Sequence, residues 1–167
     1  MSQIFKRILC PVDLSSFSLD ALRLAVKLAE TNDAMLDVLH VIHNPFDEIY
    51  MTGITQADPA SMEGYATEPQ ARAKILRATE ESSEILLKQF CREVIPSHIK
   101  VRYHVRKGDP FENILEGAED FLIDLIVLAT HGRTGIKRLV IGNVAEKVVR
   151  HAPCPVLTLK PVDKQPS

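Results

Sequence analysis

The sequence predicts an α/β protein whose five-stranded, mainly parallel sheet is covered by helices on both faces. Short apolar runs alternate along the chain with segments whose apolar residues recur at helical spacing, as in repeated strand–helix units. The run at 122–128 is apolar almost throughout, which is typical of a parallel strand buried on both faces. With 167 residues, the chain has the length of one well-buried domain, and we expect a single domain over residues 1–167.

The first part of the chain supplies two strands and a helix before the alternation breaks. Ile4–Val12 is rich in β-forming residues, and Ser15–Glu30 then has helical spacing with serines available to cap its N-terminus. Met35–Ile42 is the second predicted strand. The segment 43–68 has two prolines, two glycines and no sustained period. We interpret it as a mobile or functional excursion, because structureless connections of this length are unusual in compact domains.

The alternation resumes with a long amphipathic helix over Pro69–Val94 and a third strand over Ile99–Val105. A helix is then predicted over 109–121. Asp109 is expected to be its N-cap, because a proline follows at the first helical position and Glu112 stands at the capping-box position. The fourth strand is the run at 122–128.

A glycine-bearing loop and a helix N-terminus follow the fourth strand. Gly132, Gly135 and Gly142 lie in this loop, and the last helix is predicted over Val144–Arg150. Unpaired backbone N–H groups and the positive end of the helix dipole meet at such a terminus, and glycine lets an anion approach the backbone. The segment therefore predicts a phosphate site, and most simply a nucleotide site.

Topology predicts where this site lies. Ligands of open parallel sheets bind beyond the carboxyl ends of the strands at the point where the strand order reverses, and we expect the first and fourth strands to flank that point. Asp13 would then face the glycine loop. The chain has no GxxxxGK[ST], no GxGxxG after the first strand and no GxSxG, which disfavours a Walker-type NTPase, a dinucleotide fold and a serine hydrolase.

Composition excludes other classes of function. Apolar residues make up 46% and charged residues 25% of the chain, and the formal net charge of −2 gives no general attraction to nucleic acid or an anionic membrane. No apolar run approaches the roughly 20 residues that span a bilayer. The three cysteines form no CxxC motif, which indicates reduced thiols in a cytoplasmic protein and no zinc site.

Four segments in order resemble the universal stress protein family, and the match runs from Ile8 to about Pro161. They are ILCPVDLSSFSLDAL, LHVIHNP, GDPFENIL and ATHGRTGIKRLVIGNVAEKVVRHAPCPVL. The resemblance implies a Rossmann-like fold of the adenine nucleotide alpha hydrolase type. It also implies ATP binding in members that carry Gly, two residues, Gly, nine residues, Gly and then Ser or Thr.

This chain departs from the ATP-binding pattern at both ends, with Ala129 for the first glycine and Asn143 for the Ser or Thr. The alanine methyl costs little if its φ is negative, but it obstructs the site if φ is positive or the ligand packs there. We expect the Asn143 carbonyl oxygen to cap the last helix, with Glu146 completing the capping box, while its NH₂ donates to phosphate.

The resemblance assigns site residues by position. The adenosine wall is formed by Pro11, Val12 and Asp13, and the backbone of Val41 recognises adenine. The residues around the ribose and phosphates are Thr130, His131, Gly132 and Arg133, and Ala129 is counted with the site as the first position of the glycine pattern. The donors to the phosphate tail are Gly142, Asn143 and Val144. Any Mg²⁺ would be held mainly by phosphate oxygens and water.

Each assignment has a structural alternative. Asp13 also fits a cap or turn of the first helix, and His131 fits a turn histidine better than a general base. Arg133 fits a solvated loop as well as a phosphate clamp. We predict no catalytic residues and at most slow ATP hydrolysis. Two functions stay open: an ATP-binding stress sensor or switch, and a dimeric interaction module that binds no nucleotide.

Both functions include a homodimer. The final strand, within 155–160, is apolar and expected at a sheet edge, which proteins seldom leave exposed. The resemblance implies that this strand pairs with its copy across a two-fold axis. The tail at 162–167 is expected to be flexible.

Overall fold

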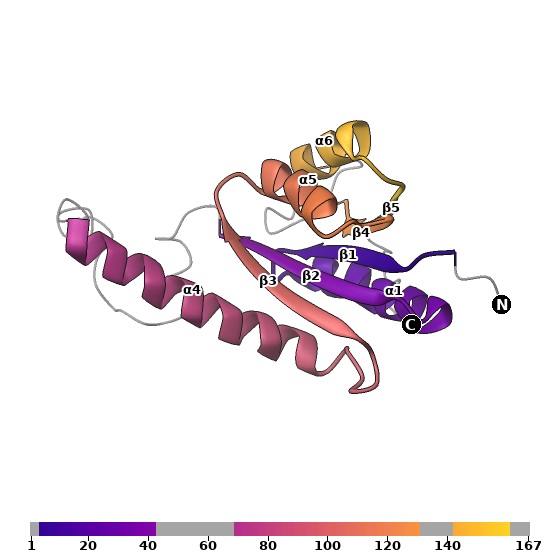
Figure 1. Ribbon diagram of the computed structural model, residues 1–167, viewed down its shortest axis with the longest axis horizontal. Coiled ribbons are helices and arrows are strands. Elements are labelled where there is room, and N and C mark those ends of the chain that lie inside the picture. Colours follow the sequence, from indigo (N-terminus) through magenta and orange to yellow (C-terminus); the bar gives the residue numbers. More distant parts are fainter. Residues whose placement is uncertain (1–3, 43–68, 131–141, 161–167) are drawn as a thin grey trace, which may run out of the picture.

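The computed structural model describes residues 4–42, 69–130 and 142–160, which form a five-stranded sheet between two layers of helices (Figure 1). The strand order is β3-β2-β1-β4-β5, and each neighbouring pair is parallel. The predicted fold class is therefore confirmed. The excursion 43–68 and the tail 162–167 lie outside the described residues.

The elements follow the predicted order along the chain. The strands are β1 Arg7–Val12, β2 Met35–Ile42, β3 Val101–Lys107, β4 Leu125–Ala129 and β5 Val156–Leu159. The helices are α1 Ser16–Asn32, α4 Pro69–Arg92, α5 Pro110–Asp120 and α6 Asn143–His151.

Two strands begin three residues later than the sequence predicted, whereas β3 begins two residues later, at Val101 instead of Ile99. The strand expected from Ile4 starts at Arg7, and Ile4 is 74% exposed. The strand expected from 122 starts at Leu125, because Leu122 has a positive φ of 51° and is exposed. Both predictions were wrong at these ends for the same reason: an apolar side chain was assigned to a strand although it faces solvent.

Strand alternation divides the core between the two faces of the sheet. On one face, alternate residues of β1, β2 and β4 pack with α1 and α4, including Leu22, Val38 and Leu87. On the other face, residues such as Leu39 pack with α5 and α6, including Ile114. Figure 1 shows α5 and α6 on the opposite side of the sheet from α4.

Local signals position the helices as predicted. Ser15 is the N-cap of α1, and its Oγ accepts the N–H of Ser18 at 3.2 Å. Asp109 caps α5, its Oδ1 accepts the N–H of Glu112 at 3.1 Å, and Pro110 occupies the first helical position. These caps begin each helix directly after a strand end and so shape the carboxyl edge of the sheet.

A buried carboxylate joins β2 to β3. The Asp37 side chain has no exposed surface, and it accepts hydrogen bonds from Arg102 Nε at 2.7 Å, Arg102 Nη2 at 3.0 Å and His104 Nε2 at 2.7 Å. The His104 ring stacks on Phe121, with centroids 4.0 Å apart. Burial alone would raise the pKa of Asp37, but the hydrogen bonds and charges of His104 and Arg102 outweigh it and hold this pKa below its ordinary value.

Candidate functional site

The strand order reverses between β1 and β4. From β1 the chain adds β2 and β3 on one side, and it then crosses to add β4 and β5 on the other. The carboxyl ends of β1 and β4 therefore lie side by side at the switch point, as the sequence predicted.

The two strands stop pairing before they end. The paired positions are Ile8 with Leu125 and Leu9 with Ile126, although both strands run three residues further. The Arg7 carbonyl accepts the N–H of Asp124. The backbone N–H and C=O groups of the odd-numbered residues of β1 therefore point toward β4. The next N–H on that side would belong to Pro11, which has none. The proline thus ends the β1–β4 ladder before the carboxyl ends of the two strands.

The turn from β1 to α1 is fixed by its own side chains. Asp13 Oδ1 accepts both the N–H of Ser15 at 3.1 Å and the hydroxyl of Ser15 at 2.6 Å. Between them, Leu14 adopts a left-handed conformation with φ of 63°, which is uncommon for a bulky residue. Asp13 therefore closes the turn before α1, as its structural alternative proposed.

The second strand ends beside the carboxyl end of β1. Met35 donates to the Lys6 carbonyl before β1, whereas Leu36 donates to the Lys100 carbonyl before β3. The backbone N–H and C=O groups of the odd-numbered residues of β2 therefore point toward β1. Val41 is one of them, and it follows His40, which pairs with Val12 at the end of β1. In this register the Val41 N–H is the ladder donor to the Val12 carbonyl, and the Val41 carbonyl is the group that points past the end of β1.

The end of β4 accommodates the alanine that replaces glycine. Ala129 belongs to the strand, and it is not among the described non-glycine residues with positive φ, which are Leu14, Asp33 and Leu122. Its methyl group therefore adds no backbone strain.

The next residue, Thr130, is tied to the edge strand. It donates its N–H at 2.9 Å and its hydroxyl at 3.1 Å to the carbonyl of Leu159, and it is 1% exposed. Thr130 therefore joins the switch point to β5, and in this structure its hydroxyl is directed to protein.

Gly142 has a structural reason to be glycine. Its N–H donates to the Thr130 carbonyl at 2.7 Å, and a Cβ at this position would lie 3.1 Å from the same oxygen. Such a contact is tighter than side chains normally make, so Gly142 permits the close approach of the loop to β4. Because this amide is already engaged, Asn143 and Val144 are the described backbone donors that remain for the predicted phosphate tail.

The expectation that Asn143 caps α6 was wrong. The helix begins at Asn143, its N-cap is Gly142 with φ of −59° and ψ of 148°, and no side chain caps it. Glu146 pairs with Arg150 at 3.0 Å, so the predicted capping box does not form. The glycine takes the cap position because its tight contact with β4 fixes the extended backbone before the helix.

Three predicted site residues, His131, Gly132 and Arg133, lie outside the described residues. Within the ranges that the structure describes, no group of three or more His, Cys, Asp or Glu is placed to hold a metal ion. None of the helices in those ranges has both the length and the apolar character needed to cross a membrane.

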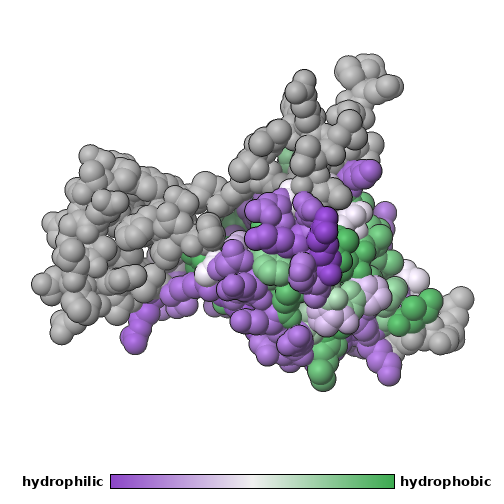
Figure 2. All heavy atoms as spheres, turned by 90° about the horizontal axis from the view of Figure 1, so that it is seen from above, coloured by the Kyte–Doolittle hydropathy of each residue, from purple (hydrophilic) through white to green (hydrophobic). Residues whose placement is uncertain are grey.

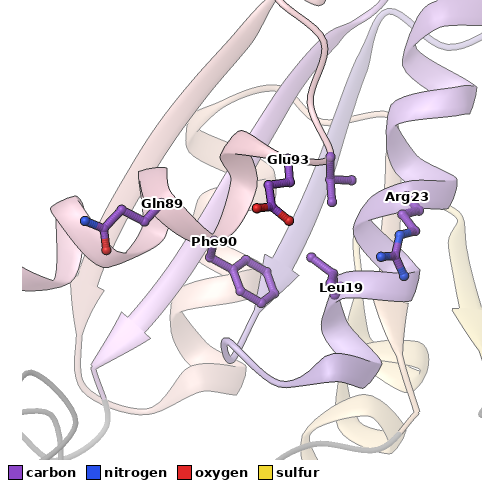
Figure 3. Close-up of a pocket in the computed structure, with 6 residues that line it drawn as sticks. Leu19, Arg23, Gln89, Phe90 and Glu93 are labelled. Atoms are coloured by element: carbon purple, nitrogen blue, oxygen red, sulfur yellow. The ribbon is translucent and has the colours of Figure 1, made fainter.

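A surface hollow of about 410 Å³ lies between α1 and α4, and none of the predicted site residues that the structure describes lines it. Leu19 on α1 and Phe90 on α4 form its apolar part, with Arg23 and Glu93 beside them (Figure 3). Its lining comes from α1, from α4 and from the turn that follows α4, so it is separate from the backbone groups that the switch point presents.

Sequence reasoning missed one polar residue beside the site. His40 is 2% exposed within β2, and its Nδ1 lies 2.9 Å from the Val12 carbonyl oxygen. A histidine inside the otherwise apolar run MLDVLHVI was an available signal, because a buried polar group requires a partner.

Comparison with known proteins agrees with this architecture. Residues 4–160 match the model of the universal stress protein family. A universal stress protein of Methanocaldococcus jannaschii, MJ0531, is 29% identical over 163 residues, which cover 97% of this chain and 86% of the relative. Universal stress protein A homolog 1 of Coxiella burnetii is 31% identical over 156 residues, covering 93% and 96% of the two chains.

Solved structures share the fold. The structure of MJ0577, a universal stress protein of M. jannaschii, has a TM-score of 0.72 at 27% identity and covers 96% of this chain and 99% of its own. A universal stress protein in complex with cAMP has a TM-score of 0.56, and an Arabidopsis thaliana family member with AMP bound has one of 0.55. Both are 19% identical to this chain. The match to the cAMP complex covers 93% of this chain and 97% of the other, and the match to the AMP complex covers 97% of this chain and 96% of the other.

The fold and the site define a parallel α/β protein in which two adjacent strands separate at the switch point of the sheet. Within that class, the chain belongs to the universal stress protein family. The resemblance given by the four sequence segments is therefore confirmed.

Proposed function

We propose that this protein binds an adenine nucleotide, ATP, at the switch point between β1 and β4 and acts as a stress-response sensor or switch. The observation that carries the proposal is the early end of the β1–β4 ladder, which leaves the carboxyl ends of these two strands unpaired with each other beside the start of α6. The neighbours solved with cAMP and AMP support an adenine nucleotide as the class of ligand.

The residues at the switch point offer each part of ATP a chemically suitable neighbour. Pro11, Val12 and Asp13 would line the adenosine, and the backbone of Val41 would face the adenine base. The first-turn amides of Asn143 and Val144, at the positive end of the α6 dipole, would hold the phosphates. Ala129, Thr130, His131, Gly132, Arg133 and Gly142 complete the proposed site. Mg²⁺ would be bound by phosphate oxygens and water.

Titration of nucleotide-free protein with ATP tests the proposal. The protein is first stripped of bound nucleotide, and ATP with Mg²⁺ is then added in a calorimeter up to millimolar concentration. We expect a saturable heat of binding with about one site per chain, because each chain contains one switch point. The absence of any saturable heat at millimolar ATP contradicts the proposal.

A second candidate function is an interaction module that binds no nucleotide. The internal bond from the Gly142 N–H to the Thr130 carbonyl favours it, because one predicted phosphate donor is already engaged. The same titration separates the two candidates, since the module predicts no ATP binding while the dimer and the fold persist.

We also propose a homodimer through β5. This strand is an edge of the sheet, Leu157 on it is 39% exposed, and Val149 on α6 is 50% exposed. Figure 2, which looks down onto the α5–α6 layer, shows hydrophobic residues interspersed with hydrophilic ones on this face. Antiparallel pairing of two β5 strands would cover this edge. We expect twice the chain mass by light scattering at micromolar concentration, and a monomer there contradicts the pairing.

The proposed compartment is the cytoplasm. Cys10, Cys91 and Cys154 are free thiols. Burial raises the pKa of Cys91 to about 12, and the pKa of Cys10 is raised by burial and by Cys91. Thiols of this kind are unreactive and are typical of proteins in a reducing environment.

A further inference from the structure

His40 makes a hydrogen bond whose direction is determined by chemistry. Its Nδ1 lies 2.9 Å from the carbonyl oxygen of Val12, and the ring is 2% exposed. A carbonyl oxygen only accepts, so the proton of this bond belongs to Nδ1. His40 therefore donates from Nδ1 to the last residue of β1.

This bond gives the Val12 carbonyl a second donor beside the ladder and so restrains the peptide unit that leaves β1. The peptide between Val12 and Asp13 is planar, so holding its carbonyl oxygen also fixes the direction of the Asp13 N–H. The chain then passes through the left-handed Leu14 to the α1 cap. On its own strand, His40 directly precedes Val41, whose N–H faces the same Val12 carbonyl in the ladder and whose carbonyl points past the end of β1. One imidazole thus links the two strand ends that the proposed adenosine contacts.

We infer that His40 is a positioning residue for the adenosine half of the site, an inference that rests on the proposed nucleotide binding. It acts by holding the Val12–Asp13 peptide and the Val41 backbone at a fixed separation. It does not contact the phosphates, which the proposal places at the start of α6 on the other side of the switch point. Loss of its bond therefore weakens recognition of adenosine and leaves phosphate binding intact.

The alternative is that His40 serves only the core. Two variants separate these roles, because asparagine places an amide nitrogen at the δ position of histidine, whereas glutamine places one at the ε position. His40→Asn keeps the donor to Val12 but leaves a cavity, and His40→Gln fills more of the volume but moves the donor. A core role makes the asparagine variant the more damaged one. A positioning role makes the glutamine variant the weaker binder.

The experiment measures ATP and inorganic tripolyphosphate binding by calorimetry in the wild type and both variants, with thermal unfolding as the control for folding. We expect His40→Gln to bind ATP about tenfold more weakly, which is the loss of one good hydrogen bond. We expect His40→Asn to stay within about threefold of the wild type, although it is the less stable variant. Tripolyphosphate affinity should be equal in all three proteins. In parallel, ¹⁵N spectra of the wild-type ring should show the proton on Nδ1.

Four results overturn the inference. They are unchanged ATP affinity in His40→Gln, an equal loss in His40→Asn, a parallel loss of tripolyphosphate binding, and a ring proton on Nε2 instead of Nδ1. A wild type that binds no ATP overturns the proposed function itself, and the inference with it. If the wild type binds ATP but one of the three contrary binding results is found in the variants, only the role of His40 is overturned.

Discussion

Replacing Asp37 with alanine is expected to lower the free energy of unfolding by about 3 kcal/mol. The value is the lower end of the roughly 3–5 kcal/mol that accompany removal of one partner from a buried ion pair. We choose the lower end because the Arg102 side chain is 38% exposed and water can solvate it after the substitution. The loss remains large because Asp37 accepts three hydrogen bonds that tie β3 to β2. Urea unfolding at neutral pH measures it.

An exposed ion pair in the same protein provides the control. Asp20 and Arg23 on α1 lie 2.6 Å apart, and both side chains are 55% exposed. Asp20→Ala should therefore change the free energy of unfolding by less than about 0.5 kcal/mol. Equal effects at Asp20 and Asp37 would show that burial of the carboxylate does not determine its contribution.

The contribution of Asp37 should also depend on pH. Its pKa in the folded protein lies below the ordinary value, so the folded state favours the ionised carboxylate. The stabilisation is complete above the unfolded-state pKa of about 4, and it is lost as the pH falls through the lower folded-state pKa. The stability difference between the wild type and Asp37→Asn should accordingly shrink in acid. A difference that grows on acidification contradicts the assigned direction.

Replacing Asn143 with proline should weaken ATP binding by roughly ten- to a hundredfold while leaving the fold intact. The loss corresponds to one hydrogen bond to a charged phosphate, about 1.5–3 kcal/mol. Proline suits this position because Asn143 is the first residue of α6, where the helix does not use the N–H. The preceding Gly142 has ψ of 148°, which is the extended conformation required before proline. Calorimetry with ATP and Mg²⁺ measures the change.

Asn143→Ala is the matched control, because it removes the carboxamide and retains the backbone N–H. We expect its ATP affinity to stay within about threefold of the wild type. An equal loss in both variants would assign the phosphate contact to the carboxamide. Unchanged affinity in the proline variant would remove α6 from the proposed site. Thermal unfolding verifies that each variant keeps its fold.

The fold was predictable because its signals are local. Ser15 and Asp109 cap the helices that the sequence assigned to them, and the apolar run of β2 has the predicted bounds. Strand ends were less predictable, because periodicity does not distinguish a buried leucine from an exposed one such as Leu122. That distinction depends on which elements pack over the residue, and packing is a tertiary property.

The site was predictable in position and less so in detail. Topology alone places Val12, Asp13 and Ala129 at the carboxyl ends of adjacent strands. The internal bond of Gly142 was not predictable, because it depends on a partner, Thr130, that is 12 residues earlier in the chain, beyond the loop. A glycine required by backbone proximity and one required by phosphate look alike in a sequence.

The alternation within β2 has a consequence for mispaired forms of the sheet. Asp37 faces the α5 layer and His40 faces the layer of α1 and α4, since successive side chains of a strand point to opposite sides. A slip of this strand by one residue would push the carboxylate into hydrocarbon and turn the imidazole away from Val12. Asp37 and His40, one on each side of the sheet, therefore both favour the native register of β2. The same two residues that stabilise the native sheet destabilise the register shifted by one residue.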